Sequence, residues 1–210
     1  MVNFSLEGKV ALVTGASYGI GFALATAFAR QGAKIVFNDI KQELVDKGLA
    51  AYKAEGIEAK GYVCDVTNEE QVNAMVAQIE KEVGVVDILV NNAGIIKLSP
   101  AENHTMEDFD AVMEVNLRSL FLLTREIARQ MISLGHGKII NTCSVQSMKG
   151  GSGDAAYVAS KHAVHGLTRA WANEWGRYNI QVNGIAPGYM VTDNTAKLRQ
   201  NREAVAAITA

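Results

Sequence analysis

The residue types most able to do chemistry are a phenol and an ammonium four positions apart, Tyr157 and Lys161. In a helix, side chains at this spacing lie on one face. A phenol alone is a poor acid or base near neutral pH because its pKa is about 10, and we expect the neighbouring ammonium to lower that pKa. Ser144 lies thirteen residues upstream of the tyrosine, and its hydroxyl could hold a substrate oxygen there. These residues predict proton transfer to or from an oxygen atom, although a tyrosine–lysine pair alone is a common coincidence.

A glycine-rich turn offers a place for a phosphate-bearing cofactor. The apolar run VALVT, residues 10–14, leads into GASYGIG, and a helical pattern follows at once. Gly15 permits the tight turn, Gly19 lets the backbone approach a pyrophosphate, and Gly21 lets the helix pack closely on the strand. The helix N-terminus adds unpaired N–H groups and a partial positive charge. The turn therefore predicts a dinucleotide site, with an ordinary tight turn as the alternative.

The choice between NAD and NADP depends on the end of the second predicted strand. Asp39 lies there, where a carboxylate can accept hydrogen bonds from the adenosine ribose and repel the additional phosphate of NADP. Tyr18, inside the glycine turn, supplies no positive charge for that phosphate. We therefore expect NAD to be preferred, with NADP possible because Lys41 lies nearby. The alternative is that Asp39 only caps the following helix.

Short apolar runs alternate with helical patterns along the whole chain. The runs are mostly continuous rather than alternating, which is typical of strands buried on both faces in a parallel sheet. The predicted strands are 10–14, 34–39, 60–65, 87–92, 138–143 and 180–186, and three predicted helices cover 68–84, 105–133 and about 154–176. This order predicts an α/β Rossmann-type domain, a doubly wound parallel sheet with helices on both faces. We interpret residues 1–210 as a single catalytic domain that binds a dinucleotide.

Helix boundaries have their own signals. Thr105 followed by Asp108 resembles a capping box, and Gly135 and Gly137 are expected to end the helix that starts there. In the preceding helix an apolar stripe at helical spacing predicts the face that packs on the sheet; its members are Val72, Met75, Val76, Ile79 and Val83.

The same residues give a resemblance to the short-chain dehydrogenase/reductase family. The matching stretches are TGASYGIG (14–21), CDV (64–66), NNAG (91–94), the asparagine of VNL (115–117), Ser144, YVASK (157–161) and APGYMVT (186–192). The resemblance covers nearly the whole chain. It implies a sheet of order 3-2-1-4-5-6 and reversible hydride transfer between a nicotinamide and a secondary alcohol or ketone.

The resemblance also implies a role for each matching residue. Tyr157 would exchange the proton with the substrate oxygen, Ser144 would hydrogen-bond that oxygen, and Lys161 would bind the nicotinamide ribose. Asn116 would anchor a water that links Lys161 to solvent. The implied cofactor-binding set comprises Gly15, Ser17, Tyr18, Gly19, Ile20, Gly21, Asp39, Asp65, Val66, Asn92, Ala93, Gly94, Tyr157, Lys161, Pro187, Gly188, Met190 and Thr192.

Within the family, the sequence most resembles the sugar-acid dehydrogenases. The first half is similar to the gluconate 5-dehydrogenases, and the second half to the 2-deoxy-gluconate 3-dehydrogenases, so the reacting carbon stays open. Polar candidates for the substrate pocket are Gln146, Lys149, Asn194 and Arg199, each of which can also be a plain surface residue. The alternative substrate is a 3-oxoacyl thioester on a carrier protein, for which NADP preference and a basic docking patch would be expected.

Composition limits the classes of partner that we expect for this chain. The formal net charge is −2, which gives no basic excess for nucleic acid. Cys64 and Cys143 lie in apolar runs, so we expect buried thiols and a reducing cytoplasm rather than disulfides. The histidines lack the spacing of metal ligands, and no metal is expected. Neither a signal peptide nor a membrane span is indicated.

The C-terminal end raises a further alternative. Chains of the resembled family continue for a helix and a last strand beyond the position of Ala210, so we expect a truncated chain that lacks this edge strand. The alternative function is then a dinucleotide-binding protein with little turnover. By analogy with the family, we expect a homo-oligomer, a dimer or a tetramer.

Overall fold

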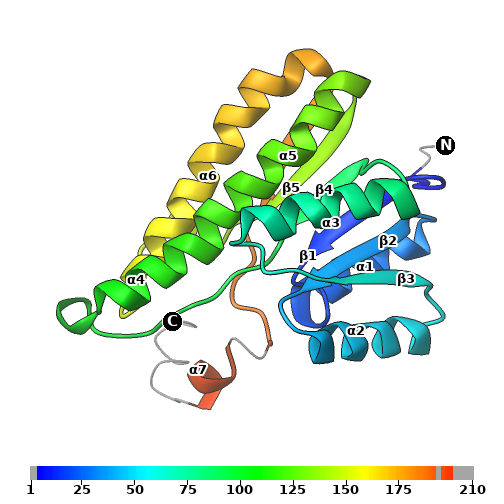
Figure 1. The fold of residues 1–210 in the computed structure, drawn as a ribbon. Helices are drawn as coiled ribbons and strands as arrows, with labels where there is room; N and C mark the ends of the chain where they lie inside the picture. Colours follow the sequence, from blue (N-terminus) through cyan, green and yellow to red (C-terminus); the bar gives the residue numbers. More distant parts are fainter. Residues whose placement is uncertain (1–3, 193–194, 201–210) are drawn as a thin grey trace.

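The computed structural model describes residues 4–192 and 195–200, and its centre is a six-stranded parallel sheet (Figure 1). The strand order is β3-β2-β1-β4-β5-β6, which confirms the predicted doubly wound arrangement. All five strand pairs are parallel. The strands are β1 (Val10–Thr14), β2 (Lys34–Asp39), β3 (Ala59–Val63), β4 (Ile88–Asn91), β5 (Gly137–Thr142) and β6 (Ile180–Ile185).

The predicted strands differ from the observed ones only at their ends. The largest difference is at β3, which stops at Val63 rather than Asp65. The chain turns there because the Asp65 carboxylate accepts hydrogen bonds from the Thr67 N–H, at 2.9 Å, and the Thr67 hydroxyl, at 2.7 Å. Such local side-chain bonds compete with continuation of a strand.

Helices cover both faces of the sheet. One face packs against α1 (Gly19–Arg30) and α2 (Gln42–Ala54). The opposite face packs against α3 (Glu69–Glu82), α5 (Ser119–Leu134) and α6 (Ala155–Trp175), which lie side by side in Figure 1. Shorter elements are α4 (Met106–Met113), α7 (Ala196–Gln200) and four irregular turns, Ala101–Asn103, Glu114–Arg118, Val145–Ser147 and Gly176–Tyr178. No helix in the described ranges is both long and apolar enough to cross a membrane.

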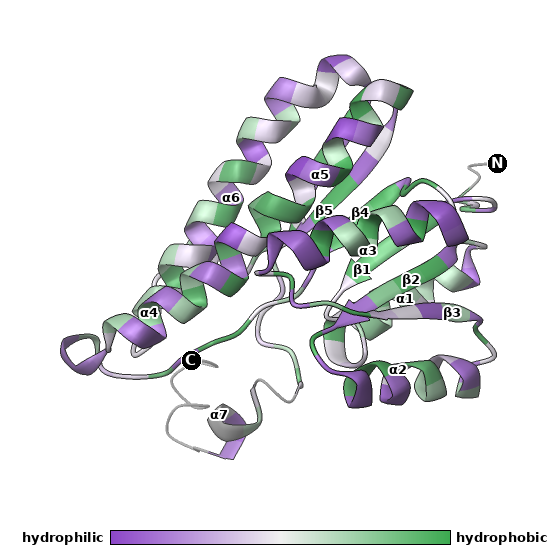
Figure 2. Cartoon of the chain, in the orientation of Figure 1, coloured by the Kyte–Doolittle hydropathy of each residue, from purple (hydrophilic) through white to green (hydrophobic). Residues whose placement is uncertain are grey.

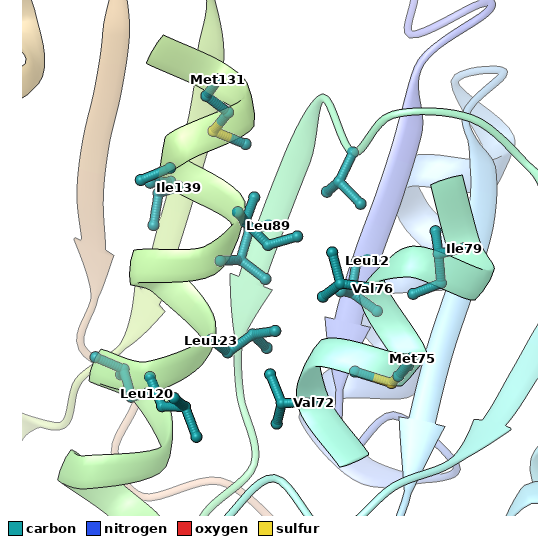
Figure 3. Close-up of a cluster of buried hydrophobic side chains, with 14 of the residues drawn as sticks. Leu12, Val72, Met75, Val76, Ile79, Leu89, Leu120, Leu123, Met131 and Ile139 are labelled. Atoms are coloured by element: carbon teal, nitrogen blue, oxygen red, sulfur yellow. The ribbon is translucent and has the colours of Figure 1, made fainter. Parts of the chain in front are cut away.

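The larger core cluster lies between the sheet and the α3/α5 layer. Figure 3 shows α5 and α3 directing aliphatic side chains onto β1, β4 and β5. The predicted stripe of α3 is confirmed, since Val72, Met75, Val76 and Ile79 are buried and Val83 packs beside them. On α6, Trp171 and Trp175 stack with ring centroids 5.3 Å apart. Figure 2 shows the resulting pattern, with hydrophobic central strands and hydrophilic residues toward the outside of the helices.

The predicted helix 105–133 is confirmed as a continuous helical run over 106–134, but it contains a π-helical turn that the sequence pattern did not indicate. It begins as expected at Thr105, whose hydroxyl accepts the Asp108 N–H at 3.1 Å, and it ends at Gly135 in the left-handed conformation. Between α4 and α5, however, residues Glu114–Arg118 form a π-helical turn. The buried Asn116 side chain in this turn is bonded to the backbone of Ile95, so the turn widens where a side chain connects the helix to the sheet.

A cavity variant tests this core. Leu123 is 1% exposed and lies between α5 and the sheet, so Leu123→Ala should lower the free energy of unfolding by about 2–5 kcal/mol. Leu134, 49% exposed on the same helix, is the matched control, and Leu134→Ala should change it by no more than about 0.5 kcal/mol. Urea unfolding followed by circular dichroism measures both. Equal effects for the two variants would contradict the proposed packing.

Candidate active site

The glycine turn between β1 and α1 requires its first and third glycines sterically. Gly15 has φ +59°, and a Cβ there would lie 3.1 Å from the Ala93 Cα. A Cβ on Gly21 would lie 2.6 Å from the Asn92 amide nitrogen and 2.9 Å from the Gly15 carbonyl oxygen. Side chains at these positions would therefore push the turn away from the end of β4, as the sequence interpretation expected.

The end of β4 holds the turn in place through hydrogen bonds. The Asn92 side-chain nitrogen donates to the carbonyl oxygens of Thr14, at 2.9 Å, and Gly15, at 3.1 Å. In return, the Thr14 hydroxyl accepts the backbone N–H groups of Asn92 and Ala93 at 2.9 and 3.0 Å. Asn92 and Ala93 thus position the turn in addition to lining the space beside it.

The turn has the features that a phosphate group needs. Within the described residues, Gly19 has φ +65° with no atom within 4 Å of a Cβ placed on it. The N-terminus of α1 has neither a side-chain cap nor an acidic residue in its first turn, among the residues whose structure is given. In the same part of the chain the Ser17 hydroxyl is buried without a hydrogen-bond partner. An uncapped helix N-terminus with an unpaired hydroxyl and an open glycine face fits a dinucleotide pyrophosphate.

The residues expected around the adenosine lie at the ends of β2 and β3. Asp39 is 9% exposed, and its Oδ1 accepts the Ile40 N–H at 2.9 Å. The N-cap of α2 is Lys41, so Asp39 does not take the capping alternative. Val66 lines a small cavity together with Thr14 and Ala93, which places the residues after β3 beside the glycine turn. Tyr18 is 39% exposed, with the Lys47 ammonium 5.7 Å from its ring centroid.

Ser144, Tyr157 and Lys161 come together at the end of β5. Ser144 is 6% exposed; its hydroxyl accepts the Gln146 N–H at 3.2 Å and hydrogen-bonds the Tyr157 phenol. The Lys161 nitrogen lies 5.6 Å from the Tyr157 ring centroid and donates to the Thr142 carbonyl at 2.6 Å. The helix α6 and the end of β5 therefore assemble the three groups that the sequence singled out.

Burial is the largest influence on the pKa values of Tyr157 and Lys161. Desolvation raises the pKa of Tyr157 above its ordinary value; the bond from Ser144 lowers that pKa, and the charges of Asp154, Tyr189 and Cys143 raise it. Burial lowers the pKa of Lys161 to about 8, against a smaller raising effect of Cys143. Lys161 is not among the groups that shift the Tyr157 pKa here, so the expectation that it lowers that pKa stays a prediction.

Asn116 connects the site to the π-helical turn. Its Oδ1 accepts the Ile95 N–H at 2.8 Å, and its Nδ2 donates to the Ile95 carbonyl at 2.9 Å and to the Ser160 hydroxyl at 3.1 Å. Ser160 precedes Lys161 on α6. A Cβ on Gly94 would lie 3.2 Å from the Asn116 Oδ1, so that glycine allows the close approach. Asn116 therefore ties the extension of β4 to the helix that carries Lys161.

The segment after β6 reaches the same edge. The Pro187 carbonyl accepts the Val145 N–H at 3.2 Å, and a Cβ on Gly188 would lie 2.4 Å from the Val145 side chain. Met190 is 51% exposed. The Thr192 N–H donates to the Thr195 hydroxyl at 3.1 Å.

The polar candidates for the substrate pocket differ in their burial and contacts. Gln146 is buried, and its Nε2 donates to the Tyr189 hydroxyl at 3.1 Å. Lys149 is exposed, and Arg199 is exposed and donates to the Thr192 carbonyl at 3.3 Å. Asn194 lies outside the described residues. Of the three candidates that the structure describes, Gln146 is the one next to the Ser144–Tyr157 pair.

Sequence reasoning missed two side chains that approach Tyr157, namely Asp154 and Tyr189. Asp154 precedes α6 and resembles a helix cap in sequence, while Tyr189 stands between motif residues to which roles had been given. Their charges and hydrogen bonds become visible only when both segments fold against β5. Among the described residues no group of three or more metal-ligating side chains occurs.

Comparisons with known proteins agree with this geometry. A sequence model described as short chain dehydrogenase matches residues 9–203. Gluconate 5-dehydrogenase of Gluconobacter oxydans is 46% identical over 200 residues, which cover 95% of this chain and 78% of that protein.

Two crystal structures extend the comparison. Gluconate 5-dehydrogenase from Burkholderia cenocepacia, in complex with NADP and tartrate, has a TM-score of 0.91 at 42% identity and covers 96% of this chain and 79% of its own. The 2-keto-3-deoxy-D-gluconate dehydrogenase from Streptococcus agalactiae has a TM-score of 0.80 at 58% identity, covering 93% and 74%. The chain therefore belongs to the short-chain dehydrogenase family and is an NAD(P)-dependent oxidoreductase that acts on CH–OH groups of a small molecule.

Proposed function

We propose that this chain interconverts a secondary alcohol and a ketone in a sugar acid such as gluconate and 5-ketogluconate. The observation that carries the proposal is the meeting of Ser144, Tyr157 and Lys161 at the same edge of the sheet as a glycine turn with features that fit a dinucleotide. The names of the relatives support the sugar-acid class, since each acts on gluconate or a keto-deoxy-gluconate by its own description.

The proposed mechanism assigns one task to each side chain. Tyr157 accepts the alcohol proton in oxidation and returns it to the carbonyl oxygen in reduction, while Ser144 holds that oxygen against the phenol. Lys161, fixed by the Thr142 carbonyl, faces the Tyr157 ring and binds the nicotinamide ribose. Asn116 fixes the backbone beside Lys161 and anchors the water through which its proton reaches solvent. When bound, the nicotinamide supplies or receives the hydride.

The remaining residues form the proposed cofactor site. The pyrophosphate binds at the glycine turn, the adenosine at the ends of β2 and β3, and the nicotinamide between the end of β4 and the segment after β6. The residues are Gly15, Ser17, Tyr18, Gly19, Ile20, Gly21, Asp39, Asp65, Val66, Asn92, Ala93, Gly94, Pro187, Gly188, Met190 and Thr192. We propose NAD as the preferred dinucleotide because Asp39 is acidic, although the Burkholderia relative was crystallised with NADP.

The wider setting is proposed on the same basis. Residues 1–210 would act as one catalytic domain in the cytoplasm, as a dimer or tetramer by analogy with the family. A 3-oxoacyl thioester on a carrier protein is the second substrate class; the net charge of −2 offers its acidic carrier no general attraction. A third candidate is dinucleotide binding with little turnover.

A substrate panel tests the proposed activity. The purified chain is mixed with NAD or NADP and with gluconate, other sugar acids and a 3-oxoacyl thioester analogue, and nicotinamide absorbance is followed. We expect turnover with sugar acids, and Tyr157→Phe should reduce kcat by about 10²-fold or more while dinucleotide affinity stays nearly constant. Cofactor binding without turnover on any substrate would favour the binding-only alternative. Unchanged turnover in Tyr157→Phe would remove that residue from the mechanism.

The proton balance predicts opposite pH dependences for the two directions. Oxidation needs the phenolate of Tyr157, and the raised pKa of that phenol keeps it protonated near neutral pH. The value of kcat/KM for alcohol oxidation should therefore rise between pH 6 and pH 8, by up to about tenfold per unit. Reduction needs the protonated phenol, so its kcat/KM should stay level or fall over the same interval. Initial rates at saturating dinucleotide measure both, and oxidation that slows as pH rises would refute the assignment.

The Asp39 carboxylate provides the test of cofactor choice. In Asp39→Asn the ribose keeps a hydrogen-bonding partner, but the charge that repels a 2′-phosphate is gone. The ratio of kcat/KM for NAD to that for NADP should fall by about 10- to 100-fold. Asp46→Asn, an exposed acid on α2, is the control and should leave the ratio within about twofold. An unchanged ratio in Asp39→Asn would show that Asp39 does not select the dinucleotide.

A further inference from the structure

Asp154 begins α6 but does not cap it. An aspartate at this position usually accepts an N–H from the first turn of its helix, yet within the described chain its side chain makes no such bond. The carboxyl instead turns inward, is 3% exposed, and is hydrogen-bonded by the Gln146 side chain and its own backbone N–H. Burying a carboxyl that does not cap the helix lowers the stability of the folded protein. Asp154 is therefore a candidate for another role.

Two hydrogen-bond acceptors at this place have no partner among the described residues. One is Asp154 Oδ1 and the other is Gln146 Oε1, on a side chain that is 7% exposed. The Gln146 Nε2 is used by the Tyr189 hydroxyl, so the free atom of that amide is an acceptor as well. Both side chains face Gly151, where a Cβ would lie 2.4 Å from Asp154 Oδ1 and 2.7 Å from Gln146 Nε2. The two acceptors thus belong to one polar cluster.

The cluster lies directly beside the reacting groups. The Gln146 N–H donates to the Ser144 hydroxyl, which in turn bonds the Tyr157 phenol. Asp154 lies one helical turn before Tyr157 and acts on its charge, as does Tyr189. The cluster therefore adjoins both groups that would hold the substrate oxygen, Ser144 and Tyr157.

Donors on a ligand would satisfy these two unpaired acceptors. A hydroxyl group on a carbon next to the reacting one is such a donor, whereas the methylene groups of a simple ketone are not. A carboxylate would be repelled by Asp154, so the acid group of the substrate must lie at the far end from the reacting carbon. The cluster therefore suits a carbinol flanked by hydroxylated carbons and remote from the carboxylate.

We propose that Asp154 and Gln146 select polyhydroxylated substrates by accepting hydrogen bonds from hydroxyl groups on the carbons beside the reacting one. This rests on the proposed oxidoreductase function and adds the residues that recognise the substrate. It also favours reaction near the end of a sugar acid away from its carboxylate.

The test compares gluconate with 5-hydroxyhexanoate, which keeps the carboxylate and a secondary alcohol at carbon 5 but lacks the other hydroxyl groups. Asp154→Asn keeps the size of the side chain but replaces one acceptor oxygen by an NH2 group, which is a donor. It should lower the ratio of kcat/KM for gluconate to that for 5-hydroxyhexanoate by about 10- to 100-fold, because only gluconate loses hydrogen bonds, whereas any change that acts through the Tyr157 pKa is common to both substrates. Gln146→Leu should show the same selectivity with a smaller loss, and the exposed Asp110→Asn should change neither value more than about twofold.

Two results would overturn the proposal. One is an equal loss for both substrates, which would mean that Asp154 acts through Tyr157 or through the fold. The other is no loss for gluconate. If the wild-type chain turns over no substrate, the proposed function fails, but calorimetric titration of gluconate into the NAD-loaded protein still measures the subsite. Weaker binding to Asp154→Asn than to wild type would then support it, and equal or absent binding would reject it.

Discussion

Where parallel strands end inside a protein, the last backbone carbonyl groups lose their ladder partners and need other donors. This chain meets that need with side chains that also build its active site. Asn92 donates to the carbonyls after β1, and Lys161 donates to the last carbonyl of β5. Asn38 does the same for the Cys64 carbonyl beside β3. The carboxyl edge of the sheet is therefore closed in part by residues of the proposed cofactor and substrate site.

These hydrogen bonds hold the side chains of the site in position. Burial disfavours the charged form of Lys161. The hydrogen bond to the Thr142 carbonyl holds its ammonium group in place. Asn116 then links the helix of Lys161 to the backbone of Ile95. A dinucleotide laid along this edge meets groups whose positions are already determined by the ends of the strands, so little ordering is left for binding to accomplish.

Sequence patterns predicted a doubly wound parallel sheet because continuous apolar runs alternate with helical patterns, and the resemblance to the family implied the strand order. They also located Ser144, Tyr157 and Lys161, which occupy fixed positions relative to their strand and helix. The patterns failed where a contact between distant segments decides the outcome. The π-helical turn lies where Asn116 binds Ile95, and the raised Tyr157 pKa has burial as its largest cause, with contributions from Asp154 and Tyr189. Neither spacing nor composition records such contacts.

The stacked tryptophans of α6 give the protein a built-in optical reporter. The chain has two tryptophans, Trp171 and Trp175, and both belong to the helix that carries Tyr157 and Lys161. Emission excited at tryptophan wavelengths thus originates from that helix alone, without any label. Loss of this signal tracks the detachment of α6 from the sheet, whereas far-ultraviolet dichroism averages over every helix. Overlaying the two denaturation curves separates fraying of the catalytic helix from collapse of the whole domain.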